Sequence, residues 1–198
     1  MFTKNADESI RALAEVALIA QIRRWLGALA PTSPQGMGDD CAVVDWPKGM
    51  KQILTTDSLS YGQHFDDSVS AHDAGANLIN RNLRDIAAMG GRPGEALLDL
   101  LGGGDLQTDW LAAFFDGICD ACQEYDLPIV GGDISTLPNG QFTAVLSLTG
   151  YSEKTPLLRK GAQAGDALYV TGTLGGSLLK KHYNFKPRLT EGQWLAQS

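Results

Sequence analysis

The stretch between residues 38 and 58 decides how the rest of the chain is interpreted. It begins Gly38-Asp39-Asp40-Cys41-Ala42-Val43-Val44, turns at Pro47-Lys48-Gly49, and resumes as Ile53-Leu54-Thr55-Thr56-Asp57-Ser58. Two apolar runs of strand length on either side of a Pro/Gly turn predict a β-hairpin or a closely related pair of strands. Acidic residues precede the first run and follow the second, and in an antiparallel pair those two ends lie side by side.

The predicted pairing gathers oxygen atoms at one end of a sheet, namely the carboxylates of Asp39, Asp40 and Asp57 and the hydroxyls of Thr55 and Thr56. Carboxylates packed together repel and raise each other's pKa unless a cation neutralises them. Oxygen ligands in that number suit Mg²⁺ far better than zinc. The alternative is that these acids are solvated turn residues, because Asp favours loops. This stretch alone supports the two interpretations about equally.

The composition is that of an acidic globular protein. Of the 198 residues, 43% are hydrophobic and 20% are charged, which is the usual balance for a chain that buries a core. The net charge of −7 and the pI near 4.8 argue against a nucleic-acid surface, which needs clusters of Lys and Arg. No basic-then-apolar leader opens the chain and no apolar run is long enough to span a bilayer, so the predicted location is the cytoplasm.

The three cysteines predict packing and no chemistry. Cys119 and Cys122 lie in a helical pattern without a second CxxC pair, and Cys41 stands apart from both. We expect all three to be buried or half-buried small apolar residues, with neither zinc nor a redox pair.

Hydrophobic spacing predicts the main elements. Helices are expected over residues 7–28, 71–89 and 108–125, and strands over residues 96–101, 127–130, 142–151 and 167–171. The last strand opens into a glycine-rich turn and a short helix that lack the lysine of a P-loop. A polar connector at 152–155 predicts a domain boundary, so that residues 1–150 form one domain and residues 151–198 begin a second.

Asp85 and His64 are candidate site residues outside the opening stretch. Asp85 falls in the final turn of the helix predicted over 71–89, where the helix dipole disfavours a negative charge. A bound cation would compensate that charge, and so would Arg81 or Arg84. His64 lies in a polar loop; a lone loop histidine is more often exposed than functional, but here the loop follows Asp57 closely.

The triplet Gly131-Gly132-Asp133 follows a predicted strand. Glycines let backbone N–H groups face an anion, and the aspartate can hold a metal ion on that anion. The same triplet also occurs as an ordinary turn, so it is weak evidence by itself.

Six motifs in this order resemble the thiamine-monophosphate kinase family, which belongs to the aminoimidazole-ribonucleotide-synthetase-like superfamily. The motifs are Gly38–Ala42; Thr55-Thr56-Asp57 with His64-Phe65; Asn82–Gly90; Gly131-Gly132-Asp133; Arg159 with Gly161 and Gly165-Asp166; and Thr171–Gly175. Each motif is weak alone, and the six in order are specific. The resemblance covers nearly the whole chain from Gly36 onward.

The resemblance implies an α/β fold, with a mixed sheet flanked by helices in an N-terminal domain that dimerises through its sheet. It implies an enzyme that transfers the γ-phosphoryl group of ATP to thiamine monophosphate by direct in-line transfer with Mg²⁺, giving thiamine diphosphate. The partners would be ATP, thiamine monophosphate and a second copy of the chain, with no nucleic acid and no membrane.

The resemblance also assigns roles to individual residues. It implies that Mg²⁺ is held by Asp40, Thr56, Asp57, Asp85 and Asp133. It implies nucleotide contacts for Thr55, Gly131, Gly132 and Arg159. His64 would face the phosphate of thiamine monophosphate.

Three departures from the family pattern stand out. Arg84 occupies a position where the family usually has Ser, next to Asp85, and Phe115 one that often carries Tyr near the adenine. The chain stops at Ser198, whereas family members are longer, so we expect a fragment that lacks a further acidic motif and an aromatic substrate pocket.

Two other functions stay open at this stage. The chain resembles, more distantly, other ATP-using enzymes of the superfamily with aminoimidazole ribonucleotide, selenophosphate or hydrogenase-maturation chemistry. As an isolated piece it would instead be a non-catalytic, dimerising nucleotide- and metal-binding domain. Apolar strand edges at 43–44, 53–54 and 97–101 need covering, which predicts a homodimer.

Overall fold

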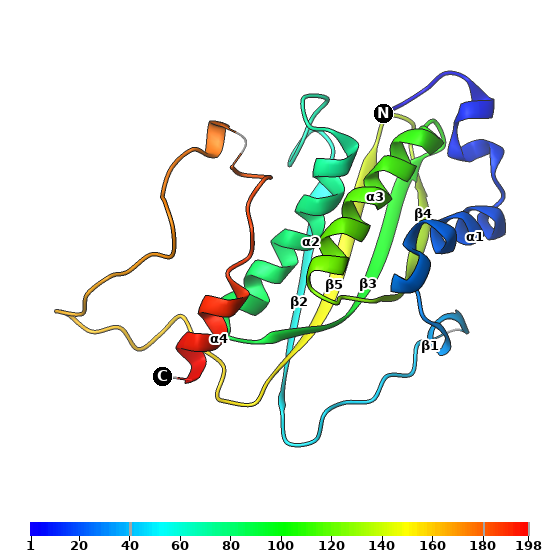
Figure 1. The fold of residues 1–198 in the computed structure, drawn as a ribbon. Coiled ribbons are helices and arrows are strands. Elements are labelled where there is room, and N and C mark those ends of the chain that lie inside the picture. The colour runs from blue at the N-terminus through cyan, green and yellow to red at the C-terminus, as the bar shows by residue number, and fades with distance from the viewer. Residues whose placement is uncertain (40, 180, 198) are drawn as a thin grey trace.

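The computed structural model describes residues 1–39, 41–179 and 181–197 and contains one mixed four-stranded sheet in the order β2-β5-β3-β4 (Figure 1). The strands are β1 (Thr32–Asp39), β2 (Lys51–Ser60), β3 (Arg92–Gly103), β4 (Ile129–Leu137) and β5 (Phe142–Ser152). The helices are α1 (Glu15–Leu26), α2 (Ala71–Ala88), α3 (Thr108–Glu124) and α4 (Leu189–Gln197), with short 3₁₀ turns at Ala6–Glu8, Ile10–Ala12, Gly27–Leu29 and Ser177–Leu179.

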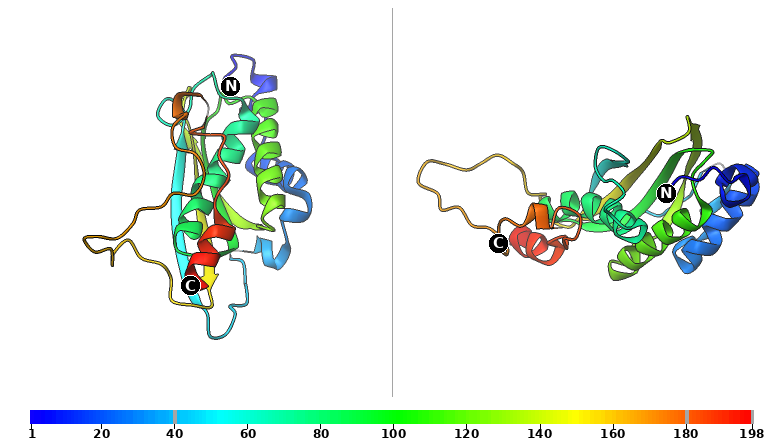
Figure 2. Two further views of the ribbon diagram at one scale, coloured as in Figure 1. Left: turned by 60° about the vertical axis from the view of Figure 1, so that its left-hand side comes forward. Right: turned by 90° about the horizontal axis from the view of Figure 1, so that it is seen from above.

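The helices α2 and α3 cover one face of the sheet (Figures 1 and 2). Side chains alternate along a strand, and in β5 the even-numbered residues Ala144, Leu146 and Leu148 are buried under the helices. Among the described residues no helix covers the opposite face of the sheet (Figure 2). We call that opposite face the open face.

Antiparallel and parallel pairings are combined in the sheet. β5 pairs antiparallel with β2 on one side and with β3 on the other, and β3 pairs parallel with β4. Parallel neighbours need a crossover connection, and α3 supplies it between β3 and β4. β2 and β4 are therefore the two edges of the sheet, separated by β5 and β3.

The predicted hairpin is wrong. Val43 and Val44 are not in a strand, and β2 pairs with β5, which lies far along the chain. β1 contains Gly38 and Asp39, the start of the acidic stretch, and is not one of the strands of the four-stranded sheet. Asp57 consequently stands inside β2 and not beyond its end.

Three other expectations about elements and burial are wrong. The strand predicted over 167–171 is not formed, and Leu168 and Tyr169 are over 90% exposed in a segment that extends away from the sheet (Figure 1). Cys41 is exposed, whereas Cys119 is half-buried and Cys122 buried as predicted. The first helix begins at Glu15 and not at residue 7.

The remaining element predictions are confirmed with small shifts at their ends. α2 and α3 match the helices predicted over 71–89 and 108–125, and β3 and β5 contain the predicted strands. β4 runs further than expected, because it continues through Gly131-Gly132-Asp133 instead of turning there. No helix in the described part of the chain is both long enough and apolar enough to cross a membrane.

Candidate functional site

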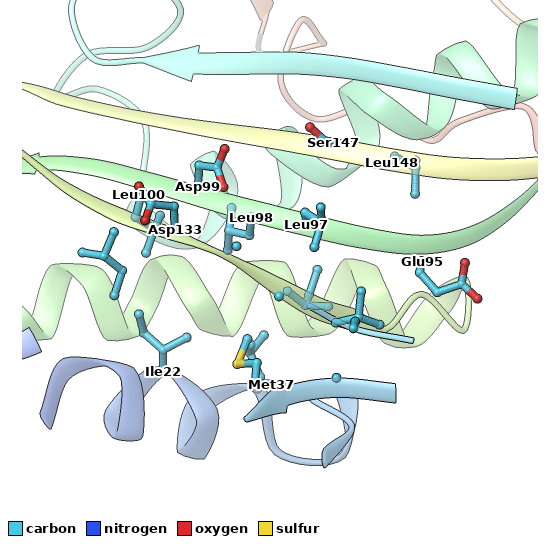
Figure 3. A pocket seen from close by; sticks show the side chains of 18 of the residues that line it. Ile22, Met37, Glu95, Leu97, Leu98, Asp99, Leu100, Asp133, Ser147 and Leu148 are labelled. Atoms are coloured by element: carbon cyan, nitrogen blue, oxygen red, sulfur yellow. The ribbon is translucent and has the colours of Figure 1, made fainter. Parts of the chain in front are cut away.

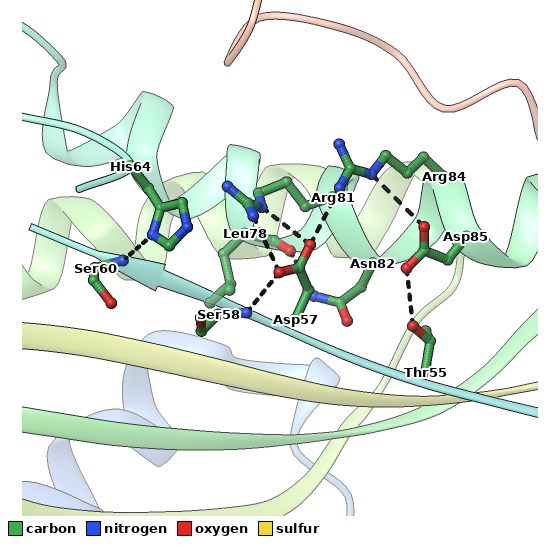
Figure 4. A network of polar contacts seen from close by, with 10 residues as sticks. All are labelled: Thr55, Asp57, Ser58, Ser60, His64, Leu78, Arg81, Asn82, Arg84 and Asp85. Atoms are coloured by element: carbon green, nitrogen blue, oxygen red, sulfur yellow. Dashed lines mark hydrogen bonds and ion pairs between the residues drawn. The ribbon is translucent and has the colours of Figure 1, made fainter.

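Asp57 lies at the centre of a polar network between β2 and α2 (Figure 4). Its side chain points toward α2 and accepts two hydrogen bonds from Arg81, at 3.0 and 3.2 Å. A third bond comes from Arg84, whose Nη2 lies 3.3 Å from Asp57 Oδ2. Both partners of the Asp57–Arg81 pair are partly buried, with 22% and 18% of their side chains exposed.

Asp85 joins the same network through Thr55. The hydroxyl of Thr55 donates to Asp85 Oδ2 at 2.9 Å, and Arg84 Nε lies 3.7 Å from Asp85 Oδ1 (Figure 4). Thr55 and Asp57 face the same side because they are two residues apart in a strand. Arg81 and Asp85 are neighbours on α2 because they are four residues apart in a helix.

The network holds Asp57 in its ionised form. Burial alone raises the pKa of Asp57, but the hydrogen bond and positive charge of Arg81 lower it. The Ser58 N–H and the charge of Arg84 lower it further, so that the pKa of this carboxyl lies below its ordinary value. The described chain thus presents an ionised Asp57 whose charge is balanced by two arginines.

His64 lies close to this network, in the loop that follows β2 (Figure 4). Its Nδ1 accepts a hydrogen bond from the Ser60 N–H at 2.9 Å, which leaves Nε2 to carry the proton of the neutral ring. Burial and the charge of Arg81 lower the pKa of His64, and Asp57 only partly offsets them. His64 is therefore mainly neutral near pH 7.

Asp133 lies at the other edge of the sheet, on β4. It is exposed, accepts a hydrogen bond from the Ser135 hydroxyl at 2.8 Å, and is paired in register with Asp99 of β3 (Figure 3). Two strands separate β4 from β2, and neighbouring strands lie about 4.8 Å apart, so Asp133 is at least about 14 Å from Asp57. One copy of the described chain does not bring these two residues together.

The glycines before Asp133 allow a close contact between backbones. A Cβ atom at Gly132 would come 1.8 Å from the Leu98 carbonyl oxygen, so no larger residue fits there. Gly131 lines a cavity of about 1250 Å³ that also contacts Asp99, Asp133 and Met37 (Figure 3). In this structure the two glycines let neighbouring strands pack closely. The sequence analysis weighed only anion binding and an ordinary turn, and did not consider this role.

The remaining predicted residues are spread over the molecule. Thr56 points to the open face, where its hydroxyl contacts that of Ser147 at 3.3 Å. Arg159 is exposed in the segment that follows β5. Asp40 lies outside the described residues. Among the residues that the structure describes, no three His, Cys, Asp or Glu side chains are grouped as a metal site.

The structure adds residues that sequence reasoning missed. Arg81 was considered as a partner for Asp85, but it holds Asp57 with a two-point contact instead. Asn82 packs beside Asp57 in Figure 4 and is fully buried, and its side-chain oxygen has no hydrogen-bond partner among the described residues. Asn82 is the first residue of the motif Asn82–Gly90, but the sequence analysis gave it no role of its own. Phe115 is also fully buried, against Trp25.

The sequence matches a family model. Residues 38–152 match the N-terminal domain of AIR synthase related proteins, which is more than half of the chain. The chain therefore belongs to this family, and the predicted α/β fold is confirmed. Two structures of the hydrogenase maturation protein HypE, one of them in complex with ATP, are 20–21% identical with TM-scores of 0.54 and 0.59 and agree in fold alone.

Within the family, the most similar proteins that we compare are thiamine-monophosphate kinases. The chain is 39% identical over 176 residues to that of Rhodopirellula baltica and 32% identical over 182 residues to that of Escherichia coli (strain K12). These matches cover 85% and 81% of this chain and 55% of each relative. The chain thus spans about half the length of these curated relatives.

Solved structures give the same result. The thiamine-monophosphate kinase from Stenotrophomonas maltophilia K279a is 30% identical with a TM-score of 0.76, over 93% of this chain and 65% of that one. AaThiL complexed with AMPPCP and TMP is 28% identical with a TM-score of 0.70, over 100% of this chain and 66% of that one. The recognition of the family from six motifs is confirmed.

Proposed function

We propose that this chain is the nucleotide- and metal-binding part of a kinase that transfers the γ-phosphoryl group of ATP to thiamine monophosphate. The observation that carries the proposal is the network of Asp57, Asp85 and Thr55, which stands in motifs that resemble those of thiamine-monophosphate kinases, and two such kinases are 39% and 32% identical to this chain. A related structure contains AMPPCP and TMP, which fit a nucleotide and a thiamine monophosphate substrate.

The proposal keeps the residue roles implied by the motifs. Mg²⁺ would be held by Asp40, Thr56, Asp57, Asp85 and Asp133. The nucleotide would contact Thr55, Gly131, Gly132 and Arg159, and His64 would contact the substrate phosphate.

The donor set of the network fits Mg²⁺. Asp57, Asp85 and Thr55 offer only oxygen atoms, which are the ligands that this ion prefers. The buried side-chain oxygen of Asn82 is a further acceptor beside them. When bound, Mg²⁺ would neutralise phosphate charge and align the transferred group.

The protein side chains have complementary tasks. Phosphoryl transfer needs alignment and charge neutralisation more than covalent chemistry. The neutral His64 would donate its Nε2–H to a phosphate oxygen, and Arg81 keeps Asp57 ionised and in place. Burial raises the pKa values of Cys119 and Cys122, so neither thiol is an activated nucleophile. These features favour direct in-line transfer without a phospho-enzyme.

The wider organisation follows from the same proposal. Residues 1–150 would form the metal-binding, ATP-binding and dimerisation domain, and residues 151–198 would begin a second domain. The proposal also places the protein in the cytoplasm and makes it a homodimer. Exposed apolar residues on β2 and β3, Leu54 at 69% and Leu97 at 45%, favour a partner for the open face.

A second candidate is a dimerising domain that binds nucleotide and metal without catalysis. The observation in its favour is that one copy of the described chain holds Asp57 and Asp133 at opposite edges of the sheet and so does not assemble the proposed set of carboxylates. Activity of the complete protein with thiamine monophosphate but none of residues 1–198 alone would assign this role to the isolated chain.

Calorimetric titration with a non-hydrolysable ATP analogue, with and without Mg²⁺, tests the proposal. We expect binding that depends on Mg²⁺, because the ion must join two sets of negative charge. The complete protein is then assayed with ATP and thiamine monophosphate, and with the substrates of related enzymes as controls. Absence of both binding and thiamine diphosphate formation in the complete protein would refute the kinase.

A further inference from the structure

Arg84 contacts both carboxylates that the proposed function gives to Mg²⁺. Its Nη2 lies 3.3 Å from Asp57 Oδ2 and its Nε 3.7 Å from Asp85 Oδ1 (Figure 4). Half of the Arg84 side chain is exposed, at 51%, whereas Arg81 is 18% exposed and grips Asp57 at two points. Arg84 is therefore the arginine of the network that is free to swing away.

Arg84 also lines a cavity whose wall contains several cationic side chains. This cavity of about 570 Å³ lies between the end of α2 and the C-terminal segment. Its charged and titratable lining residues are Arg84, His182, Lys186, Arg188 and Glu191. Three permanent cations thus face one carboxylate, in a chain whose net charge is −7. Such a concentration of positive charge suits an oxyanion.

The ion pairs around this cavity are weak enough to be exchanged. Lys186 pairs with Glu124 at 2.8 Å and Arg188 with Glu191 at 3.1 Å, and all four side chains are at least 39% exposed. Exposed pairs of this kind contribute little to stability, so their cations remain available to a stronger anion. Planar guanidinium groups such as Arg84 bind phosphate oxygens at two points.

We propose that Arg84 is a positioning residue that couples anion binding in this cavity to metal binding at Asp57 and Asp85. Without an anion Arg84 pairs with both carboxylates and competes with Mg²⁺. A phosphate group in the cavity, from a nucleotide or from a phosphorylated substrate, draws Arg84 away and leaves both carboxylates to the metal ion. This inference rests on the proposed function. By linkage, each ligand must tighten the other by the same factor.

The test measures Mn²⁺ binding to the chain by electron paramagnetic resonance, in sulfate and in chloride of equal ionic strength. Mn²⁺ stands in for Mg²⁺ because it takes the same oxygen ligands. Sulfate is a tetrahedral oxyanion that represents the phosphate group. Arg84→Gln removes the charge and shortens the side chain but keeps a polar amide. Arg24→Gln is the matched control, because Arg24 is exposed on α1 and contacts Gln21.

In chloride we expect Arg84→Gln to bind Mn²⁺ about fivefold more tightly than wild type, because the ion pairs of the half-exposed Arg84 with Asp57 and Asp85 no longer compete. Sulfate should tighten Mn²⁺ binding by wild type and by Arg24→Gln but not by Arg84→Gln. Arg84→Lys keeps the positive charge but loses the two-point geometry of the guanidinium group. Sulfate should therefore tighten Mn²⁺ binding by this variant by an intermediate factor. Replacing sulfate by AMP or by thiamine monophosphate then separates the two sources of the phosphate group.

Two results would overturn the inference. Equal Mn²⁺ affinity of wild type and Arg84→Gln in chloride would show that Arg84 does not compete with the metal. An equal sulfate effect in both would show that Arg84 does not carry the coupling. In either case measurable Mn²⁺ binding leaves the proposed metal site intact. Absence of Mn²⁺ binding by every protein, the complete kinase included, would refute the metal site itself.

Discussion

At the scale of single residues, His64 reports on the charge of the network beside it. We expect its pKa to lie below 6.5, because burial and the charge of Arg81 disfavour the imidazolium. Arg81→Gln should raise the pKa of His64, since it removes a repelling cation and frees Asp57 to attract the proton. The pKa is measured by following the His64 ring protons in NMR spectra against pH.

The same shift has a consequence for stability. A histidine whose pKa is lowered by folding contributes stability in full above its unfolded value of about 6.5, and that contribution is lost as the pH falls through the folded pKa. His64→Gln should therefore flatten the pH dependence of the unfolding free energy below pH ~6.5. Arg24→Gln, on α1, should leave the His64 titration unchanged. A pKa of His64 at or above the ordinary value would contradict the prediction.

Asp85 tests the metal site with little disturbance of the fold. In the complete protein that we propose to be a kinase, we expect Asp85→Asn to lower turnover by about 10²-fold or more, because one charged ligand of the proposed metal site is lost. The free energy of unfolding should fall by less than about 1 kcal/mol, because the Arg84 contact is exposed. Steady-state kinetics and chemical denaturation measure the two effects.

The matched control is Asp120→Asn, which removes a carboxylate that is 72% exposed and pairs with His72 on α2. It should change neither turnover nor stability beyond a few tenths of a kcal/mol. Near-normal turnover of Asp85→Asn would remove this residue from the metal site.

At the scale of elements, helix α2 and helix α3 approach each other through glycines. A Cβ at Gly75 would come 2.0 Å from the Phe114 carbonyl oxygen, and one at Gly117 1.9 Å from that of His72. Ala favours a helix over Gly by about 1 kcal/mol in an open position. Here we expect Gly75→Ala to destabilise by about 1–3 kcal/mol instead, because the helices must move apart.

Chemical denaturation measures this effect. Ala88→Gly is the control, because Ala88 is the exposed last residue of α2. It should cost up to about 1 kcal/mol through helix propensity alone. A gain in stability from Gly75→Ala would show that the two helices do not touch there.

The sequence predicted elements whose signal is local. α2 and α3 carry a helical apolar stripe over many residues, so their spans differ from the predictions by a residue or so at an end. The pairing of strands carries no such signal. β2 pairs with β5, which lies about 90 residues further along the chain, and the Pro/Gly turn that predicted a hairpin instead joins a segment outside any strand, with exposed Val43, to β2. Which strands become neighbours depends on tertiary packing.

The residues of the candidate site were likewise predictable where the signal is local, and their neighbours across the fold were not. Motifs identified Thr55, Asp57 and Asp85, and strand and helix periodicity explains why they meet between β2 and α2. Asp133 came from an equally good motif, yet the strand order puts it on the opposite edge of the sheet. No local pattern encodes strand order. Arg81 was missed as the partner of Asp57 because that contact joins residues 24 positions apart.

At the scale of the whole molecule, the separation of Asp57 and Asp133 bears on the proposed homodimer. Two strands lie between β2 and β4, and the Asp57 side chain faces α2 while Asp133 is paired with Asp99 on the open face. The open face also exposes Leu54 and Leu97. Covering that face with a second copy would bury apolar surface and bring a second set of carboxylates to it.

One copy does not bring these two carboxylates together and Asp57 faces α2, so a site that uses both needs the β4 edge of one copy beside the β2 edge of its partner. We therefore predict that each active site takes Asp57 from one copy and Asp133 from the other. Asp57→Asn and Asp133→Asn, each inactive alone in the complete kinase, should regain activity when they are mixed and allowed to exchange subunits. Half of the dimers in an equal mixture are mixed and each has one intact site, so about a quarter of wild-type activity is expected. Native mass spectrometry confirms the exchange. A mixture with exchanged subunits but no activity would show that Asp57 and Asp133 do not meet across two copies, and it would remove Asp133 from the metal site.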